Sequence, residues 1–481
     1  MKDLKFRWVF ICYAAVLSLV VLNIYPANDD WVYGAPQPES NILEGLMPSQ
    51  EFWRPIHNIL SAFLGKFPRL FPMINHCLCL ICHFTLCLLL YALLKKIVRK
   101  PLAVYSGTLF FCLSPGIAAT VSNPDMFEQL LAALFGASAA LCFFKARSQG
   151  KTLYYLCWLV CAFMAVLSKE HGIAWFLAPV MLYMVYSYSQ HDHGLARLFR
   201  ENCLHLAAGL AGMFCYFALR FYLMGGVVLG SSSGRYALNF SPLNILKNYA
   251  LIIGSAVTSI DPLAIFLRPR NLSLAVVTLC ISFVFLVYIL VCLFDIFRND
   301  RKKFIVIAGL FVCAGYISSP LVVMTRVADN TTYEMVFMMS LILGIVLASR
   351  NWSSRTCVIM SIMLLCMGCV LGHKLYAVHT YSLETHEFIA EHRDDFLNIP
   401  AKVFVYYVRD VPNSGYSVYS APIGEGLYRG RAFNSVWDWK ADFTVKTVSS
   451  DADIDFTPAS LPEYDTVFSL TRSGTLKVLR N

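Results

Sequence analysis

The chain has 481 residues, of which 58% are hydrophobic and 14% are charged, and its mean hydropathy is +0.59. Ordinary soluble domains contain about 45–50% apolar and about 25% charged residues. A soluble protein of this size has no interior large enough to hide so much apolar surface. The composition therefore excludes a water-soluble enzyme and favours an integral membrane protein.

Apolar stretches long enough to cross a hydrocarbon core of about 30 Å recur along the first three quarters of the chain. We expect transmembrane helices, about 11 in all, near residues 8–25, 72–94, 102–119, 126–144, 152–168, 172–189, 202–224, 271–297, 304–324, 333–349 and 356–376. The pattern predicts an all-α polytopic membrane domain over residues 1–379. The first stretch lacks a small-residue cleavage site, so we expect an anchor there and not a cleaved signal.

Basic residues gather at alternate ends of these stretches. They form the groups Lys2, Lys5 and Arg7; Lys95, Lys96, Arg99 and Lys100; Lys145, Arg147 and Lys151; Arg197 and Arg200; Arg298, Arg301, Lys302 and Lys303; and Arg350 and Arg355. This positive-inside pattern explains the net charge of +9 without a nucleic-acid partner and places the N-terminus in the cytoplasm. Residues 245–266 are also apolar, but a crossing there would put the group at 298–303 outside. We therefore expect a re-entrant or interfacial segment at 245–266.

Residues 380–481 differ from the rest and predict a small, water-soluble α/β domain. A helical start at Leu383–Phe396 precedes strand candidates at Lys402–Val408, Gly415–Ser420, Phe443–Val448 and Thr466–Arg480, the last divided by a turn at Arg472-Ser473-Gly474. An odd number of crossings places this domain outside the cytoplasm. All 17 cysteines precede residue 370, so structural disulfides are not expected in it. We interpret the domain as a stabilising cap, with acceptor binding as the alternative.

The first external loop, residues 26–71, opens on the acidic pair of Asn28-Asp29-Asp30-Trp31. Ionisable residues at a membrane edge are costly and are therefore functional candidates. Repulsion between two adjacent carboxylates raises one pKa, which suits a general base. The simpler interpretation is a solvated loop start with helix-capping acids, and composition alone favours it.

The same loop contains Glu51-Phe52-Trp53-Arg54-Pro55-Ile56. Pro55 is suited to the first position of a helix, where no backbone donor is needed. Arg54 then lies at the positive end of that helix, which is a natural anion site. The alternative is interfacial anchoring, with Trp53 and Arg54 at the depth of the lipid headgroups.

A Lys–Glu pair lies between two apolar stretches, in Ser168-Lys169-Glu170-His171-Gly172. Such a pair is costly near a membrane unless it has a function. Lys169 is suited to holding a phosphate, with Glu170 orienting the phosphate or a neighbouring residue. The alternative is a short external turn with a solvated ion pair.

Weaker candidates lie at the same ends of the spans: Asp125, Glu128, Arg220, Arg235, Arg326, Asp329 and Glu334. Snorkelling of a long side chain to the interface is the alternative explanation for Arg220. The histidines His57, His76 and His83 have no metal-binding spacing, so we expect them to be packed or hydrogen-bonded.

Together these groups resemble the GT-C superfamily of membrane glycosyltransferases, in particular its protein O-mannosyltransferase and aminoarabinose transferase branch. Asp29-Asp30 match the acidic pair that opens the family's first external loop, and Trp53-Arg54-Pro55-Ile56 match its Arg-Pro-Leu-like motif. Asn75-His76 are similar to an Asn-His element that begins the family's second long helix. Lys169-Glu170-His171-Gly172-Ile173 match a Lys-Glu-x-Gly-Ile motif. The resemblance in motifs and topology covers residues 1–225; beyond them it is architectural only.

The second external loop departs from the family's pattern. Family members often carry a His-Pro and a Gly-Arg-x-Asp element there, whereas this chain has Ser114-Pro115 and Ser122-Asn123-Pro124-Asp125-Met126-Phe127-Glu128. The second acidic position is therefore open between Asp125 and Glu128. The chain also lacks the repeats and the β-trefoil insertion of the eukaryotic members.

The resemblance implies a transferase of a bacterial inner membrane that takes a sugar from a polyprenyl-phosphate donor on the periplasmic side. Asp29 or Asp30 would deprotonate an acceptor hydroxyl or amine, which then attacks the anomeric carbon with inversion. The donor phosphate would be held by basic residues and the site supported by acidic and polar ones: Arg54, Lys169, Arg220 and Arg326, and Glu170, Asp125, Glu128 and His76. No cofactor is required and no residue pattern indicates a metal, although some relatives bind a divalent ion. The acceptor is open between a lipid, a glycan and a protein.

Proteins of other classes are alternatives. A transporter or flippase for lipid-linked glycans would place its buried charges near the bilayer midplane and show inverted repeats, and the sequence shows neither pattern. A polymerase or ligase would carry its large external loop late in the membrane part, whereas here it comes first. A non-catalytic assembly factor would use the C-terminal domain as its working part.

Overall fold

The computed structural model describes residues 2–26, 42–48, 52–64, 66–67, 73–190, 194–225, 238–257, 272–324, 332–349, 353–391, 402–408, 442–448, 466–470 and 476–480. Up to residue 391 these residues are mostly helical. Within the described residues, seven helices are long and apolar enough to cross a membrane: Met73–Ile97, Phe127–Gln149, Glu170–Gln190, Ala196–Leu223, Val276–Asn299, Arg301–Val322 and Ser354–Glu391. The pair Pro101–Leu113 and Pro115–Ser122, bent by 46°, forms one more candidate.

The remaining predicted spans are shorter apolar helices. They are Phe6–Val21 within α1 (Lys2–Val21), α8 (Thr152–Ser168) and α15 (Tyr333–Ala348). Large apolar side chains such as Phe214 and Phe283 lie exposed on the outer helices, and lipid is the solvent that suits them. The protein is therefore a multi-pass helical membrane protein, while the exact number of crossings stays a prediction.

The helix ends follow local sequence signals. Helix α4 (Met73–Ile97) ends in Lys95 and Lys96, and Pro101 begins α5 (Pro101–Leu113). Ser114-Pro115 then bends the chain, and the Ser114 hydroxyl accepts a hydrogen bond from Gly116 N at 3.3 Å. Helix α7 (Phe127–Gln149) ends at Gly150, whose φ of +68° lies in the left-handed region that favours glycine.

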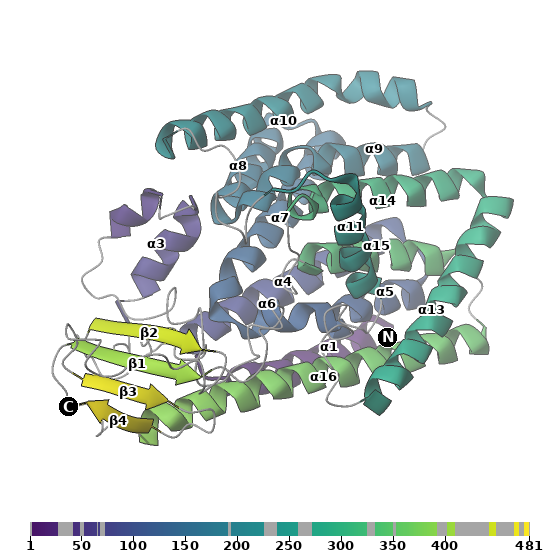
Figure 1. The fold of residues 1–481 in the computed structure, drawn as a ribbon. Coiled ribbons are helices and arrows are strands. Elements are labelled where there is room, and N and C mark those ends of the chain that lie inside the picture. Colours follow the sequence, from purple (N-terminus) through teal and green to yellow (C-terminus); the bar gives the residue numbers. More distant parts are fainter. Residues whose placement is uncertain are drawn as a thin grey trace.

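The core lies among α4, α5, α7, α9 (Ala178–Gln190), α14 (Arg301–Val322) and α15. Helix α15 is its centre, because every residue from Tyr333 to Leu347 is buried. Helices α10 (Leu195–Leu223) and α13 (Leu272–Asn299) lie at the outside of the bundle in Figure 1. The apolar character of α15 all round its circumference is thus explained by burial in protein.

Helix α11 (Pro242–Val257) covers the first part of the predicted re-entrant segment. Figure 1 shows it running across the direction of α14 and α15. Its Asn248 amide donates to the carbonyl oxygens of Val322 and Met324, each at 2.8 Å. These bonds tie α11 to the end of α14, and residues 258–271 lie outside the described residues, so the re-entrant course stays a prediction.

The C-terminal part contains a mixed four-stranded sheet of order β2-β1-β3-β4. Strand β1 (Lys402–Val408) pairs in parallel with β2 (Asp442–Val448) and β3 (Thr466–Leu470), and β3 pairs antiparallel with β4 (Leu476–Arg480). These strands coincide with three of the four predicted strand regions; the fourth, Gly415–Ser420, lies outside the described residues. Helix α16 (Ser354–Glu391) runs unbroken through the predicted domain boundary at 379/380 and through most of the helical start at Leu383–Phe396.

The sheet, the C-terminus and the helix α3 (Pro55–Leu64) lie at one end of the helix bundle, on the left of Figure 1. Helices α10 and α16 finish at the same end.

Candidate functional site

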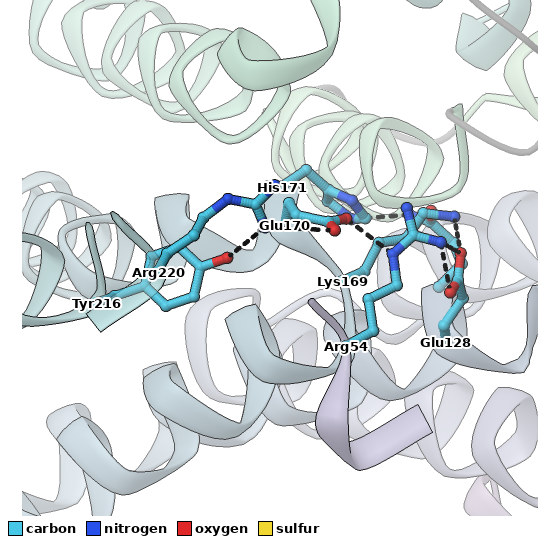
Figure 2. Close-up of polar contacts among 8 residues, drawn as sticks. Arg54, Glu128, Lys169, Glu170, His171, Tyr216 and Arg220 are labelled. Atoms are coloured by element: carbon cyan, nitrogen blue, oxygen red, sulfur yellow. Dashed lines mark hydrogen bonds and ion pairs between the residues drawn. The ribbon is translucent and has the colours of Figure 1, made fainter. Parts of the chain in front are cut away.

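Charged side chains from four separate parts of the chain meet at this end of the bundle (Figure 2). Arg54 immediately precedes α3, Glu128 lies in the first turn of α7, and Arg220 lies in the last turn of α10. Lys169 lies between α8 and the short 3₁₀ helix η5 (Glu170–Phe176), and Glu170 is the first residue of η5. We call Arg54, Glu128, Lys169, Glu170 and Arg220 the charged cluster.

Arg54 is the centre of the charged cluster. Its Nη1 donates to both carboxylate oxygens of Glu128 at 2.7 Å, and its Nε donates to Glu170 Oε2 at 2.8 Å. The guanidinium carbon also lies 4.1 Å from the centre of the Phe52 ring. A planar guanidinium can serve two carboxylates at once, which an ammonium group does less well.

Lys169 makes the second cationic contact to Glu128. Its Nζ lies 2.8 Å from Glu128 Oε1, and the two side chains are 12% and 5% exposed. Glu128 thus has a cation on each side and is nearly removed from solvent. A carboxylate buried in this way is stable only when it is paired, so Arg54 and Lys169 keep it charged.

Arg220 joins the charged cluster through Glu170. Its Nη1 lies 3.6 Å from Glu170 Oε1 and donates to the Tyr216 hydroxyl at 3.4 Å. The Tyr216 ring stacks on Trp53 at 5.8 Å between centroids, and Trp53 Nε1 donates to Leu46 O at 2.9 Å. Arg220 is 3% exposed as a side chain, so snorkelling into solvent does not explain its position.

The turn that presents Lys169 and Glu170 depends on close backbone approach. Lys169 N donates to Ala165 O at 3.1 Å and closes α8, and Gly172 N donates to Lys169 O at 2.9 Å. A Cβ on Gly172 would lie 2.5 Å from the carbonyl carbon and oxygen of Ala165. Only glycine therefore lets η5 begin so close to the end of α8.

A second group of buried polar residues fixes η5 from behind. His171 Nε2 lies 3.1 Å from Glu334 Oε2 and 3.0 Å from Gln129 Nε2. The other carboxylate oxygen of Glu334 accepts a hydrogen bond from Trp175 Nε1 at 3.1 Å. Sequence reasoning noted Glu334 only as a weak candidate and did not consider Gln129 or Trp175. An acid at the start of the otherwise apolar α15 was the available signal.

His57, in the first turn of α3, is buried beside the charged cluster. Burial, aided by the charges of Arg54 and Lys169, lowers the pKa of His57 to about 4 against the opposite effect of Glu128 and Glu170. His57 is therefore neutral at ordinary pH and adds no positive charge to the cluster.

His76 lies apart from the charged cluster. Its Nε2 is 3.1 Å from Ile24 O, at the end of the first predicted span. Helix α16 holds the same segment, because Ser382 Oγ accepts a hydrogen bond from Tyr25 N at 3.2 Å and His386 stacks on the Tyr25 ring at 4.0 Å. His76 thus holds the exit of α1, five residues before Asp29.

Four other predicted site residues have no described side chains. Asp29, Asp30 and Arg326 lie outside the described residues. The backbone of Asp125 belongs to the short 3₁₀ helix η4 (Pro124–Met126), but its side chain lies outside what the structure describes. The structure thus brings together Arg54, Glu128, Lys169, Glu170 and Arg220 and leaves the positions of the predicted bases open.

A metal is not part of the described arrangement. Among the residues that the structure describes, no group of three or more His, Cys, Asp or Glu side chains is placed to hold a metal ion. The histidine His83 instead bonds two tyrosines inside the bundle, with Tyr13 Oη 2.7 Å from Nε2 and Tyr333 Oη 2.8 Å from Nδ1.

Comparison with known proteins gives distant structural likenesses only to solved structures. No protein-family model and no curated protein sequence matches the chain. Among solved structures, it is similar to the archaeal oligosaccharyltransferase AglB from Archaeoglobus fulgidus in complex with an inhibitory peptide and a dolichol-phosphate, with a TM-score of 0.44 and 12% identity over 99% of this chain and 74% of that chain. A likeness at this level assigns neither a family nor an activity. The class that the fold and the site define is a multi-pass membrane protein with a charged cluster at one end of its bundle.

Proposed function

We propose that the protein is a GT-C-type glycosyltransferase that moves a sugar from a polyprenyl-phosphate donor to an acceptor hydroxyl or amine. The observation that carries the proposal is the convergence of Arg54, Lys169 and Arg220 beside the end of the bundle. These residues lie far apart in sequence, and Arg54 and Lys169 belong to motifs that resemble that superfamily. Nearly buried ionisable groups beside membrane spans are costly and mark a functional site by default.

In this reaction the charged cluster stabilises the leaving group. The acceptor oxygen or nitrogen attacks the anomeric carbon, the bond from that carbon to the phosphate oxygen breaks, and the polyprenyl phosphate leaves with the bonding electrons. Arg54, Lys169 and Arg220 neutralise the charge that grows on the phosphate, so no general acid is needed to protonate it. Asp29 or Asp30 takes the acceptor's proton, and the configuration at the anomeric carbon is inverted.

The site faces the periplasm of a bacterial inner membrane in this proposal. The basic groups at alternate helix ends mark the opposite side as cytoplasmic. A lipid-borne donor then reaches the charged cluster from the outer leaflet, between the exposed apolar helices. The sheet at the same end is in a position to meet the acceptor, which would be a lipid, a glycan or a protein. Divalent metal is not required.

The experiment that tests the proposal compares Asp29→Asn and Asp30→Asn with Glu44→Gln, an exposed acid in the same loop. Each purified, folded variant is assayed for sugar transfer from polyprenyl-phosphate donors. We expect one aspartate variant to lose about 10²–10⁴ in rate and the Glu44 variant to keep full activity. Full activity in both aspartate variants would end the base assignment, and transport of the lipid without transfer would favour a flippase.

A further inference from the structure

We propose that Glu170 is an internal counter-ion of the charged cluster, and that the phosphate of the donor binds by displacing its carboxylate. This inference rests on the proposed function, because it assumes that the ligand of the cluster is a phosphate ester. It adds a specific role for one residue: the carboxylate of Glu170 occupies the place between Arg54 and Arg220 that the phosphate takes.

The two carboxylates of the charged cluster differ in burial. The Glu128 side chain is 5% exposed and that of Glu170 is 22% exposed, although both contact Arg54. A ligand that arrives from outside the bundle therefore meets Glu170 first. Glu128 lies behind the cations and is suited to holding them in place.

The two carboxylates also differ in how well their oxygens are bonded. Both oxygens of Glu128 accept from Arg54 Nη1 at 2.7 Å, and Oε1 is also 2.8 Å from Lys169 Nζ. Glu170 has one short bond, from Arg54 Nε at 2.8 Å, while its Oε1 is 3.6 Å from Arg220 Nη1. Among the described residues, Glu170 Oε1 is a buried oxygen without a hydrogen bond. Such an oxygen in a native structure needs an explanation.

A phosphate ester would make short contacts to both Arg54 and Arg220, which the Glu170 carboxylate does not do. It presents two non-bridging oxygens, which share its negative charge, on a tetrahedral centre, and these reach further between two cations than a planar carboxylate does. Arginine recognises such oxygens in pairs. With Glu170 displaced, Arg54 and Arg220 would contact the phosphate directly, while Lys169 would stay on Glu128 and add its positive charge nearby.

The charge of the donor matches that of the group it displaces. A sugar phosphodiester of a polyprenol has one negative charge, as the Glu170 carboxylate has. The leaving polyprenyl phosphate gains further charge, which the cations released from Glu170 can meet.

The test measures binding of two probes, inorganic phosphate and a short-chain polyprenyl monophosphate, to the full-length protein in neutral-lipid nanodiscs. The variants are Glu170→Gln, Glu128→Gln and Glu201→Gln. Glu201 is the matched control, because it pairs with Arg197 at 2.8 Å on the exposed surface of α10. If Glu170→Gln does not fold, Glu170→Asp replaces it, since the shorter side chain loses its reach to Arg54.

Loss of the competing carboxylate should tighten polyprenyl monophosphate binding about tenfold in Glu170→Gln. Glu128→Gln should bind no more tightly than the unmodified protein, and Glu201→Gln should be unchanged. Inorganic phosphate should follow the same order if the headgroup alone is recognised. Equal or weaker binding of both probes by the Glu170 variants would overturn the inference.

The assay also separates this inference from the proposed function. If Glu170→Gln binds phosphate more tightly but the unmodified protein transfers no sugar, the result would support the counter-ion role of Glu170 and rule out the glycosyltransferase activity. Sugar transfer by the unmodified protein, together with an unchanged phosphate affinity in Glu170→Gln, would support the glycosyltransferase activity and rule out the counter-ion role of Glu170.

Discussion

Arg54 links both carboxylates of the charged cluster, so its replacement affects Glu128 and Glu170 together. A partly buried carboxylate that loses its cation keeps the cost of its removal from water without the compensating attraction. Glu128 would retain Lys169, whereas among the contacts of the described residues Glu170 would retain the longer, 3.6 Å contact with Arg220.

We expect Arg54→Ala to lower the free energy of unfolding by on the order of 3 kcal/mol. Arg54→Lys should lower it less, because the charge remains while the fork that serves two carboxylates is lost. Thermal unfolding in detergent, followed by intrinsic fluorescence, measures both. Equal unfolding temperatures for Arg54→Ala and the unmodified protein would show that the charged cluster does not stabilise the fold.

His57 gives the site a pH dependence of stability. Its pKa is about 4 in the folded protein, below the value of about 6.5 expected in the unfolded chain. Between these values the unfolded chain binds a proton that the folded protein does not bind. Stability from His57 is therefore complete above about pH 6.5, and it is lost as the pH falls toward 4.

His57→Gln should remove part of this pH dependence. We expect the unfolding temperature of the unmodified protein to fall more steeply between pH 6.5 and pH 4.5 than that of the variant. The measurement is a series of thermal unfolding curves at constant ionic strength. Parallel curves for the two proteins would mean that His57 is protonated in the folded state as readily as in the unfolded chain.

At the level of elements, the turn between α8 and η5 determines where Lys169 and Glu170 point. The turn is held by Gly172 against Ala165 and by His171 against Glu334 of α15. Because α15 is the most deeply buried helix, it acts as a fixed base for the turn.

Gly172→Ala should displace this turn, since the new Cβ would meet the Ala165 backbone at 2.5 Å. We expect a loss of stability of about 1–3 kcal/mol together with weaker polyprenyl phosphate binding. Gly254→Ala is the matched control, because a Cβ at Gly254 has nothing within 4 Å. A fully stable Gly172→Ala variant with normal binding would contradict the close approach.

His171 and Glu334 should act as a pair. In a double-mutant cycle of His171→Ala and Glu334→Gln, we expect a coupling energy of about 1–3 kcal/mol, since the two side chains are in contact and buried. Thermal or denaturant unfolding supplies the four stabilities. Additive effects would show that the 3.1 Å contact contributes little.

For the whole molecule, the sequence predicted the helices better than it predicted the contacts between them. The predicted span at 126–144 corresponds to α7 (Phe127–Gln149), and β1 (Lys402–Val408) has the predicted bounds. Lipid demands long apolar runs and internal backbone hydrogen bonds, so composition alone reveals such helices. Strand β1 was visible because its residues are β-branched and aromatic.

The site was predictable as a set of residues but not as a set of contacts. Arg54, Lys169 and Glu170 drew attention as charges beside apolar stretches. That Arg54 bonds Glu170, 116 residues away, and Glu128, 74 residues away, depends on how α3, α7 and α8 pack. No local pattern reports such packing. The second group behind η5 was missed for the same reason, because Gln129 and Trp175 look like ordinary residues of apolar helices.

The orientation of the molecule is testable with reporters at its two sides. Alkaline phosphatase fused after Asn481 should be active, and the same enzyme fused after Gly150 should be inactive, because the first position is predicted to be periplasmic and the second cytoplasmic. Green fluorescent protein at the same positions should give the opposite result. Phosphatase activity at Gly150 alone would reverse the predicted orientation.

The most direct measurement of the central claim is sugar transfer by the purified, full-length protein in proteoliposomes. Polyprenyl-phosphate sugars with labelled sugar are supplied with a lipid, glycan or peptide acceptor, and the product linkage is determined by nuclear magnetic resonance. We predict release of polyprenyl phosphate and a product whose anomeric configuration is inverted. Both should be lost when Arg54 and Lys169 are replaced together by alanine. A product with retained configuration, or transfer that continues in that double variant, would contradict this prediction.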